Sequence, residues 1–308
     1  MSPASPFRRR AVAACVACLL TTAAIAAQSN QPRLPVLPVA PQGKGFIWKI
    51  ERDGRVGWLV GSIHVLTRDH YPLPDAMEKA FMRSVILMEE VDQRELATPE
   101  LIALVQQKGF YQDNRSLETE VSKDTFVAIK KRVEKLGFEI DRFQRMKPWM
   151  VSLTLMALEV QKGGFDSAHG VDRHFFEKAP RMGKKFRALE TAAEQIGFLA
   201  DLDTPMQEAM FREAAEGRDS ELAQVTAMAN AWRRGDIQAL ERILLATMKD
   251  APKVYDTVFV QRNRAWVPKI EECLAEGHCF IVVGAGHLIG PDGLLVELEK
   301  RGYTVDQQ

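Results

Sequence analysis

The stretch Val56-Gly57-Trp58-Leu59-Val60-Gly61-Ser62-Ile63-His64 decides the fold, because it joins an apolar strand directly to a histidine. About 220 residues later, Phe280-Ile281-Val282-Val283-Gly284-Ala285-Gly286-His287 repeats this arrangement. Such apolar, β-branched runs are typical of buried strands in an α/β sheet, and ligands bind these sheets at the carboxyl ends of the strands. Each run ends in Gly-x-x-His, where the glycine is expected to let the backbone turn tightly. The pair predicts two histidines at one sheet edge, with two structural buried histidines as the alternative.

Further strand signals surround these two runs. Phe46–Glu51 is followed by Arg52-Asp53-Gly54-Arg55, and an Asp-Gly pair between apolar runs predicts a β-hairpin with Val56–Val60. Val85-Ile86-Leu87-Met88 is apolar on both faces, as in a central strand. Short strands are also expected over Lys185–Leu189 and Tyr303–Val305.

Helix signals dominate the middle of the chain. Thr98-Pro99-Glu100 supplies an N-cap and a proline at the first helical position. Apolar residues then keep helical spacing through Phe126–Leu136, Met150–Val160, Val171–Lys178 and most of 192–275. The predicted fold class is therefore α/β, with a central β-sheet formed from N- and C-terminal segments and a large helical insertion around residues 97–275.

The first residues predict a secretory signal peptide. Arg8-Arg9-Arg10 forms a positive n-region, Ala11–Ala23 forms an apolar core, and Ala24-Ile25-Ala26 places small residues before a cleavage site. We expect cleavage after Ala26. An uncleaved membrane anchor is the alternative, but the apolar run is short for a membrane span. The mature protein is expected to be periplasmic or secreted, with no stable membrane span.

A Pro-rich segment, residues 27–45, separates the signal from the first strand. Its prolines are spaced three apart, which favours an extended, polyproline-like tether: they are Pro32, Pro35, Pro38 and Pro41. The expected organisation is a signal peptide over 1–26, a tether over 27–45 and one α/β domain over 46–308.

Composition indicates a folded and mildly acidic mature protein. The 308 residues are 46% hydrophobic and 27% charged, with 41 basic and 41 acidic side chains, as in an ordinary globular chain. Removal of residues 1–26 takes away three arginines and leaves 38 basic side chains against 41 acidic ones. Because no Lys/Arg stripe offers a positive field, we do not expect nucleic acid as a partner.

Two cysteines remain in the mature chain. Cys273 and Cys279 are separated by five residues, and an oxidising compartment favours a disulfide between them. The bond would join the end of a helix beginning near Val258 to the start of the last central strand. Two buried thiols are the alternative, whereas Cys-x5-Cys lacks the usual spacing of zinc ligands.

A carboxylate is expected beside the two histidines, because a third buried strand ends in Glu89-Glu90-Val91-Asp92. Strand side chains alternate between faces, so only one of Glu89 and Glu90 is expected to meet the histidines. Two neutral imidazoles and one carboxylate form a common ligand set for a divalent metal, with open positions for water and substrate. His64, one of these glutamates and His287 are therefore the candidate metal ligands.

These residues belong to a wider pattern that resembles the TraB/PrgY/GumN family, which also contains the animal Tiki metalloproteases. The resemblance extends from about Phe46 to Val305 and rests on several motifs in a fixed order. The motifs are Gly61-Ser62-Ile63-His64-Val65-Leu66 with Leu73-Pro74, Glu90-Val91-Asp92, Gly170-Val171-Asp172, Leu189-Glu190-Thr191 with Gln195, Arg262-Asn263-Arg264-Ala265-Trp266, and Val283-Gly284-Ala285-Gly286-His287-Leu288-Ile289-Gly290. The resemblance implies an α/β fold related to erythromycin-esterase-like and ChaN-like proteins.

The resemblance also implies a functional core of His64, Glu90 and His287, accompanied by Arg262 and Asn263. It implies metal-dependent hydrolysis of peptides, as in the Tiki branch, with Mn, Co or Zn as the cofactor and a peptide or small molecule as the substrate. Such a metal would act as a Lewis acid and lower the pKa of a bound water, to about 7 in favourable zinc cases.

Other roles follow from side-chain chemistry. Glu190, as a free carboxylate, is expected to accept a proton from that water. Arg262 and Asn263 suit the binding of an oxyanion or a substrate carboxylate, with a structural salt bridge at the sheet edge as the alternative. The competing function is a non-catalytic exported protein that sequesters a peptide, haem or another small ligand through His64 or His287.

Overall fold

The computed structural model describes residues 44–203, 206–208, 211–212, 221–245 and 252–308. The expected signal peptide and most of the expected tether lie outside these residues. Gly45, the last residue of the expected tether, already belongs to the fold, because its backbone N–H donates to the carbonyl of Gln308 over 2.6 Å. The ordered domain therefore begins at or before Gly45.

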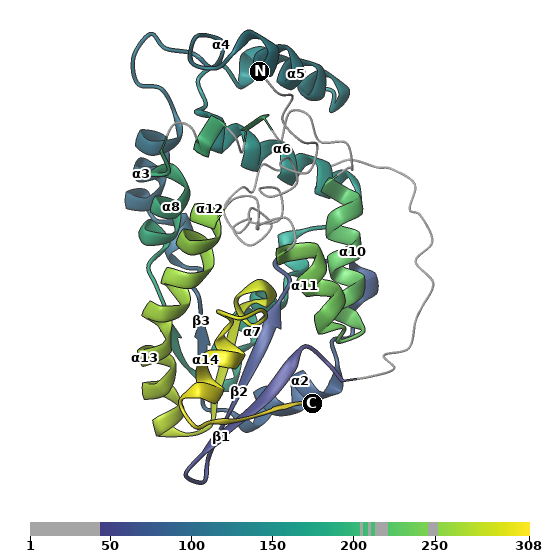
Figure 1. Cartoon of the computed structure of the whole chain (residues 1–308), viewed down its shortest axis with the longest axis vertical. Coiled ribbons are helices and arrows are strands. Elements are labelled where there is room, and N and C mark those ends of the chain that lie inside the picture. Colours follow the sequence, from purple (N-terminus) through teal and green to yellow (C-terminus); the bar gives the residue numbers. More distant parts are fainter. Residues whose placement is uncertain (1–43, 204–205, 209–210, 213–220, 246–251) are drawn as a thin grey trace.

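One six-stranded sheet forms the centre of the molecule, in the order β4-β3-β5-β2-β1-β6 (Figure 1). The strands are β1 (Ile47–Arg52), β2 (Arg55–Ser62), β3 (Ile86–Glu89), β4 (Lys185–Ala188), β5 (Cys279–Gly284) and β6 (Thr304–Gln307). The four strands β4, β3, β5 and β2 are parallel neighbours, whereas β1 pairs antiparallel with β2 and with β6. The prediction of an α/β fold whose sheet combines both ends of the chain is confirmed.

The predicted hairpin joins β1 to β2. Arg52 pairs with Arg55, which leaves a two-residue loop of Asp53 and Gly54. Both loop residues have positive φ, 53° for Asp53 and 74° for Gly54, as a type I′ turn requires. The Asp-Gly pair thus sets the register that directs β2 toward His64.

Helices make up most of the described chain outside the sheet, and in the described part of the predicted insertion β4 is the one strand. The helices are α2 (Asp75–Arg83), α3 (Pro99–Gly109), α4 (Leu117–Glu120), α5 (Lys123–Lys135), α6 (Pro148–Lys162), α7 (Val171–Lys178), α8 (Ala192–Ala200), α10 (Glu221–Arg233), α11 (Ile237–Leu245), α12 (Pro252–Tyr255), a π-helical segment (Asp256–Val260), α13 (Gln261–Glu276) and α14 (Leu294–Lys300). As expected, Thr98 caps α3, and its side chain accepts from the backbone N–H of Leu101. Within the described ranges, no helix has both the length and the apolar character needed to cross a membrane.

Helices cover the sheet on both faces, and two consecutive residues of β5 show how. The ring of Phe280 packs against Phe81 of α2 and Phe175 of α7, with centroid distances of 5.2 and 4.7 Å. Its neighbour Cys279 is bonded to Cys273 of α13. Because successive strand residues face opposite sides, α2 and α7 lie on one face of the sheet and α13 on the other.

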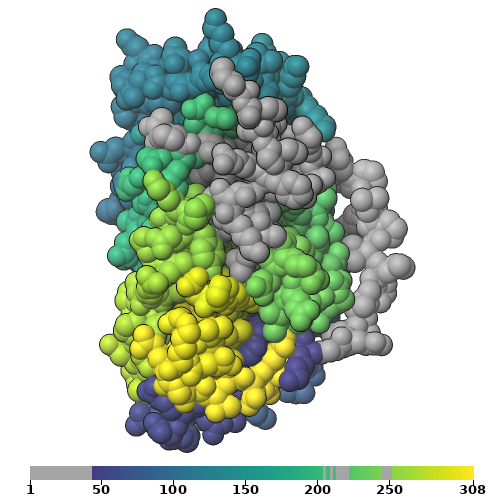
Figure 2. Space-filling view, viewed as in Figure 1, coloured from purple at the N-terminus to yellow at the C-terminus, as the bar shows by residue number. Residues whose placement is uncertain are grey.

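A second apolar cluster lies in the helical insertion, away from the sheet. The helices α4, α5 and α6 and the turn at Ile140 contribute its buried side chains, which include Leu117, Ile129, Val133 and Leu155. Figures 1 and 2 show these helices at the opposite end of the molecule from the β1–β2 hairpin. The insertion therefore has a small core of its own beyond the carboxyl end of the sheet.

The glycine of the first Gly-x-x-His motif has a different role from the one expected. Gly61 lies within β2 and is not among the residues with positive φ. A Cβ atom there would lie 2.6 Å from the Phe46 ring and 3.1 Å from the Cβ of Ala285. Glycine is required here because β2 and the turn after β5 approach each other closely, and not because the chain turns.

We expect Gly61→Ala to lower the free energy of unfolding by about 1–3 kcal/mol, as overpacking does elsewhere. Gly197→Ala is the control, because its only close neighbour would be a carboxylate oxygen of Asp201 at 3.4 Å and alanine is favoured within a helix. Urea unfolding followed by circular dichroism compares the two variants. Equal stability of Gly61→Ala and the unmodified chain would contradict the close-approach argument.

The disulfide between Cys273 and Cys279 is present, with a Cα–Cα separation of 5.9 Å. It joins the last turns of α13 to the first residue of β5, as the sequence predicted. Closing so short a loop is expected to contribute about 2 kcal/mol in the chain-entropy model. Reduction, or the double variant Cys273→Ala/Cys279→Ala, should therefore lower the urea midpoint, and alkylation of both cysteines in unreduced exported protein would show that the bond does not form in the cell.

Candidate functional site

The candidate residues meet because they follow three adjacent parallel strands. His64 follows β2, Glu90 follows β3 and His287 follows β5, and β5 lies between the other two strands. All three side chains are buried, with exposed fractions of 6% or less. The Nε2 atom of His64 lies 3.9 Å from Oε1 of Glu90, so these two side chains meet at the carboxyl edge of the sheet.

A buried guanidinium occupies the centre of this site. Arg262, in the first turn of α13, is 1% exposed. Its Nη2 donates to Glu90 over 2.7 Å and to Glu190 over 2.6 Å, and its Nε donates to the second oxygen of Glu190 over 3.1 Å. Its Nη1 donates to the carbonyl of Val258 over 3.2 Å and to Nε2 of His287 over 3.0 Å. All five N–H donors of the guanidinium are therefore used.

Local backbone structure and aromatic packing hold Arg262 in place. The π-helical segment directly before α13 includes Val258, whose carbonyl accepts from the guanidinium, and π-helical turns are frequent at functional sites. The guanidinium carbon lies 4.6 Å from the ring centre of Trp266 and 5.3 Å from that of Phe198. Trp266 also donates its indole N–H to Glu190 over 3.1 Å. Trp266 therefore combines a packing role with a polar one.

Arg262 and Asn263 determine the protonation of His287. Because a guanidinium has no acceptor, Nε2 of His287 must accept, and Nδ1 must carry the proton. Nδ1 lies 2.8 Å from Oδ1 of Asn263, whose Nδ2 donates to the carbonyls of His287 and Asp292. Burial, together with the charge of Arg262, holds the pKa of His287 well below its usual value. His287 is therefore a neutral imidazole with both nitrogens engaged.

His64 has the opposite surroundings. Its Nδ1 lies 3.2 Å from Oδ1 of Asp172, and the same oxygen accepts from the Ser62 hydroxyl over 2.7 Å. Burial alone lowers the pKa of His64, but the charges of Asp172 and Glu90 outweigh it, so the pKa is raised. Asp172 itself has a lowered pKa, because His64 and Ser62 outweigh the effect of its burial.

Both glutamates of Glu89-Glu90 line one small cavity with His64. This cavity has a volume of about 20 Å³, enough for one water molecule. The expected separation onto opposite faces does not apply, because β3 ends at Glu89 and the backbone bends at Glu90. Glu90 accepts from the backbone N–H of Gly284 over 2.6 Å, while Oε1 of Glu89 and Nε2 of His64 have no hydrogen-bond partner.

The protonation of Glu89 differs from that of an ordinary surface carboxylate. Burial, followed by the negative charges of Asp172, Glu90 and Asp92, raises the pKa of Glu89 well above its usual value. Its Oε2 accepts from the amide of Gln93 over 3.0 Å. Burial therefore favours the protonated form of Glu89 within the cavity.

Glu190 is not the free carboxylate that the sequence suggested. Arg262 and Trp266 donate to it, and Gln195 donates both to Glu190 and to Glu90 over 3.2 Å. Burial nevertheless raises the pKa of Glu190 above its usual value. Glu190 is thus an ion-pair partner of Arg262, and a role as proton acceptor would require it to leave Arg262.

The expected metal set of His64, Glu90 and His287 does not fit this arrangement. Nε2 of His287 accepts from Arg262, and Nδ1 faces Asn263. Among the side chains that the structure describes, no group of three His, Cys, Asp or Glu residues could hold a metal ion. A metal on His287 would require Arg262 to move away from Nε2.

Several contributors to the site were not assigned from the sequence. Asp172 and Gln195 fall within the motifs that carry the family resemblance, but no role was given to them. Strand alternation allowed only one of Glu89 and Glu90 at the site, and the family resemblance favoured Glu90. Asp172 is the second residue of α7, which begins directly after Gly170. A Cβ at Gly170 would lie 2.5 Å from the carbonyl of His64, so a glycine two residues before an acid in the first turn of a helix was the available signal.

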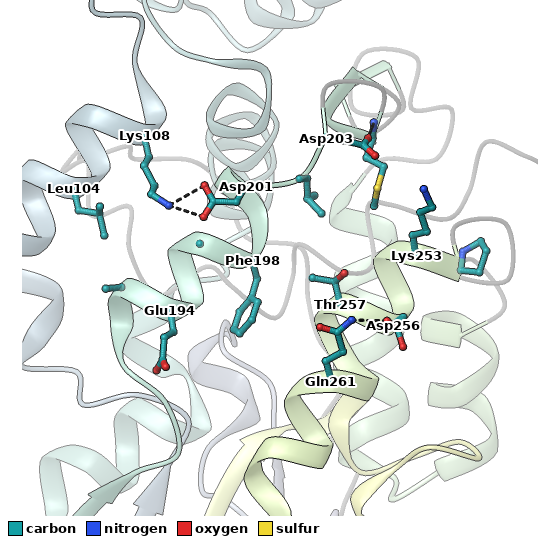
Figure 3. A pocket seen from close by; sticks show the side chains of 15 residues that line it. Leu104, Lys108, Glu194, Phe198, Asp201, Asp203, Lys253, Asp256, Thr257 and Gln261 are labelled. Carbon is teal, nitrogen blue, oxygen red and sulfur yellow. Dashed lines mark hydrogen bonds and ion pairs between the residues drawn. The ribbon is translucent and has the colours of Figure 1, made fainter.

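A larger cleft lies beside the buried residues. It has a volume of about 1230 Å³ and runs between α3 and α8 on one side and α12, the π-helical segment and the start of α13 on the other (Figure 3). Phe198, which packs on Arg262, is among its lining residues. The cleft therefore comes within one side chain of the Arg262 network.

We expect Arg262→Met to lower the free energy of unfolding by about 3–5 kcal/mol, because it leaves Glu90 and Glu190 buried without a counter-ion. Arg262→Lys keeps the charge but loses the planar fork, so an intermediate loss is expected. Arg132→Met is the control, because the Arg132–Glu159 pair is more exposed, at 11% and 17%. Urea unfolding measures all three, and equal losses for Arg262→Met and Arg132→Met would show that the network is not central to stability.

Known proteins place the chain in a family. A model of the TraB/PrgY/gumN family matches residues 46–307. Two relatives, both described as "Uncharacterized protein YbaP", from Escherichia coli (strain K12) and Shigella flexneri, are each 26% identical over 238 residues, which is 77% of this chain and 85% of theirs. No solved structure matches the chain. Because the family model spans almost the whole ordered domain, the protein belongs to the TraB/PrgY/gumN family.

Proposed function

We propose that this chain is an exported hydrolase that cleaves peptides at the cavity between His64, Glu89 and Glu90. One observation carries the proposal: a buried histidine that lines this cavity, flanked by carboxylates, has no hydrogen-bond partner at either ring nitrogen. Structural histidines in protein cores normally have their ring nitrogens satisfied, as His287 does. Unpartnered buried groups of this kind are typical of functional sites.

The residues of the cavity suit the proton transfers of hydrolysis. One group must take a proton from the attacking water, and one must return a proton to the leaving nitrogen. Nε2 of His64 and Oε1 of Glu90 lie 3.9 Å apart across the cavity and suit these two tasks. Oδ1 of Asp172 lies 3.2 Å from Nδ1 of the imidazole, and its negative charge favours the protonated ring.

Export rests on two features. The first residues form the expected signal peptide, and the disulfide between Cys273 and Cys279 is of a kind that persists in oxidising compartments. The periplasm or the extracellular space is therefore the proposed location. N-terminal sequencing should find Ala27, within a residue or two, as the first residue of the exported protein, and a retained Met1 on membrane-extracted protein would contradict cleavage.

The main test is hydrolysis of a mixed peptide library by the purified mature chain. The chelator-treated protein is assayed alone and with Mn²⁺, Co²⁺ or Zn²⁺, and its metal content is measured. Stimulation by one cation would support the expected cofactor and require Arg262 to release His287. Activity in the chelated protein would assign hydrolysis to the side chains alone.

We expect His64→Ala and Glu90→Gln each to lower kcat/KM by about 100-fold or more, the usual range for general acid–base groups. His70→Ala is a matched control, because His70 is also 6% exposed but bonds to Thr67 and lies outside the cavity. Glu89→Gln should cost less than tenfold, because burial already favours the uncharged form of the carboxyl that it replaces. Unchanged kcat/KM in both His64→Ala and Glu90→Gln would contradict the proposed hydrolase site.

The binding-protein alternative makes a different prediction for the same preparations. It expects peptides or haemin to bind without turnover, with binding lost in His64→Ala or His287→Ala. Haemin is followed by its absorbance near the Soret band. Binding without cleavage under every metal condition would favour this alternative over the hydrolase.

A further inference from the structure

The large cleft beside Arg262 combines an apolar lining with an excess of acidic side chains. Its apolar residues include Leu104, Phe198, Leu202 and Met206. Figure 3 shows Phe198 projecting from α8 between the two walls, opposite Thr257 and Gln261. At about 1230 Å³, the cleft exceeds the 300–1,000 Å³ usual for small-molecule pockets. Its size suits a peptide segment.

The charges around the cleft do not balance. Among the residues that the structure describes, four acids and two lysines line it. One pair is matched, since Nζ of Lys108 donates to Asp201 over 2.8 Å. The remaining charged residues are Glu194, Asp203, Asp256 and Lys253, which is three acids against one base. A ligand of complementary charge is therefore cationic.

Two side chains, Phe198 and Arg262, connect the cleft to the proposed reacting centre. The ring of Phe198 lines the cleft and lies 5.3 Å from the guanidinium carbon of Arg262. Arg262 in turn bonds to Glu90, which lines the cavity with His64. A ligand in the cleft thus lies two side-chain contacts from Glu90.

We propose that this cleft binds substrate peptides that carry an apolar side chain next to a positively charged one. The inference rests on the proposed peptide hydrolysis and names its substrate class. The apolar side chain packs against Phe198 and its neighbours, while the cationic group lies near Asp203 and Asp256. Neutral or acidic peptides of the same length bind more weakly.

Fluorescence anisotropy on the full mature chain with Glu90→Gln tests this preference without hydrolysis. Three rhodamine-labelled hexapeptides are compared: one with Leu-Phe-Lys at its centre, one with the lysine acetylated, and one with Ser-Ser-Lys. At low ionic strength the first should bind about three- to tenfold tighter than the acetylated peptide, as expected for two partly exposed charge pairs. It should bind more than about tenfold tighter than the Ser-Ser peptide, and 0.5 M salt should remove only the charge preference.

The double variant Asp203→Asn/Asp256→Asn removes two charges but keeps the local hydrogen bonds. Asp203 accepts from the backbone N–H of Met206, and Asp256 accepts from the amide of Gln261, which asparagine oxygens can also do. The variant should lose the preference for the unmodified lysine. Asp75→Asn/Asp306→Asn is the control, because it makes the same change in charge at exposed positions outside the cleft.

The proposal is overturned if the three peptides bind alike, if none binds, or if the Asp203→Asn/Asp256→Asn variant keeps the full preference. Hydrolysis of the same peptides by the unmodified chain tests the proposed peptidase activity independently of the binding preference. Selective binding without cleavage would support the proposed ligand of the cleft and contradict the proposed hydrolase function. Cleavage without a charge preference would support the proposed hydrolase function and contradict the proposed ligand of the cleft.

Discussion

The fold around the site depends on one buried positive charge. Removing a guanidinium from water costs several kcal/mol unless each N–H meets an acceptor, and Arg262 meets this condition with acceptors from four separate parts of the chain. Glu90 follows β3, Glu190 follows β4, His287 follows β5, and Val258 lies in the π-helical segment before α13. A shift of any one of these elements would leave a buried donor or carboxylate unpaired. The register of α13 against the sheet edge is therefore closely constrained.

Much of the fold is readable from local sequence, because the responsible signals are local. The Asp53-Gly54 turn requires two positive φ angles, and the apolar runs of β2, β3 and β5 have no polar face because helices cover both sides of the sheet. The order of the strands in the sheet, by contrast, cannot be read from local sequence. It depends on pairings such as that of Val60 with Val282, which join residues more than two hundred positions apart and leave no periodic trace in either segment.

The candidate site was predictable to a similar extent. Residues that follow parallel strands must share one sheet edge, so His64, Glu90 and His287 could be grouped from their positions alone. The position of Arg262 could not be derived in this way, because it depends on how α13 docks from outside the strand pattern. Strand alternation also failed at Glu89 and Glu90, because alternation applies only within a strand and β3 ends between them. The predicted metal site therefore took account of His64, Glu90 and His287. It did not take account of the Arg262 side chain, which lies among them.

The two Gly-x-x-His motifs look alike in sequence but place their histidines in opposite electrostatic surroundings. His64 lies between carboxylates, which raise its pKa and favour a proton. His287 is buried beside a guanidinium, which lowers its pKa and fixes one neutral tautomer. Groups whose environments separate their pKa values can perform different tasks in one site. In this arrangement His64 is suited to exchanging protons, and His287 is suited to holding Arg262 in position, so an equal sequence pattern does not imply an equal chemical role.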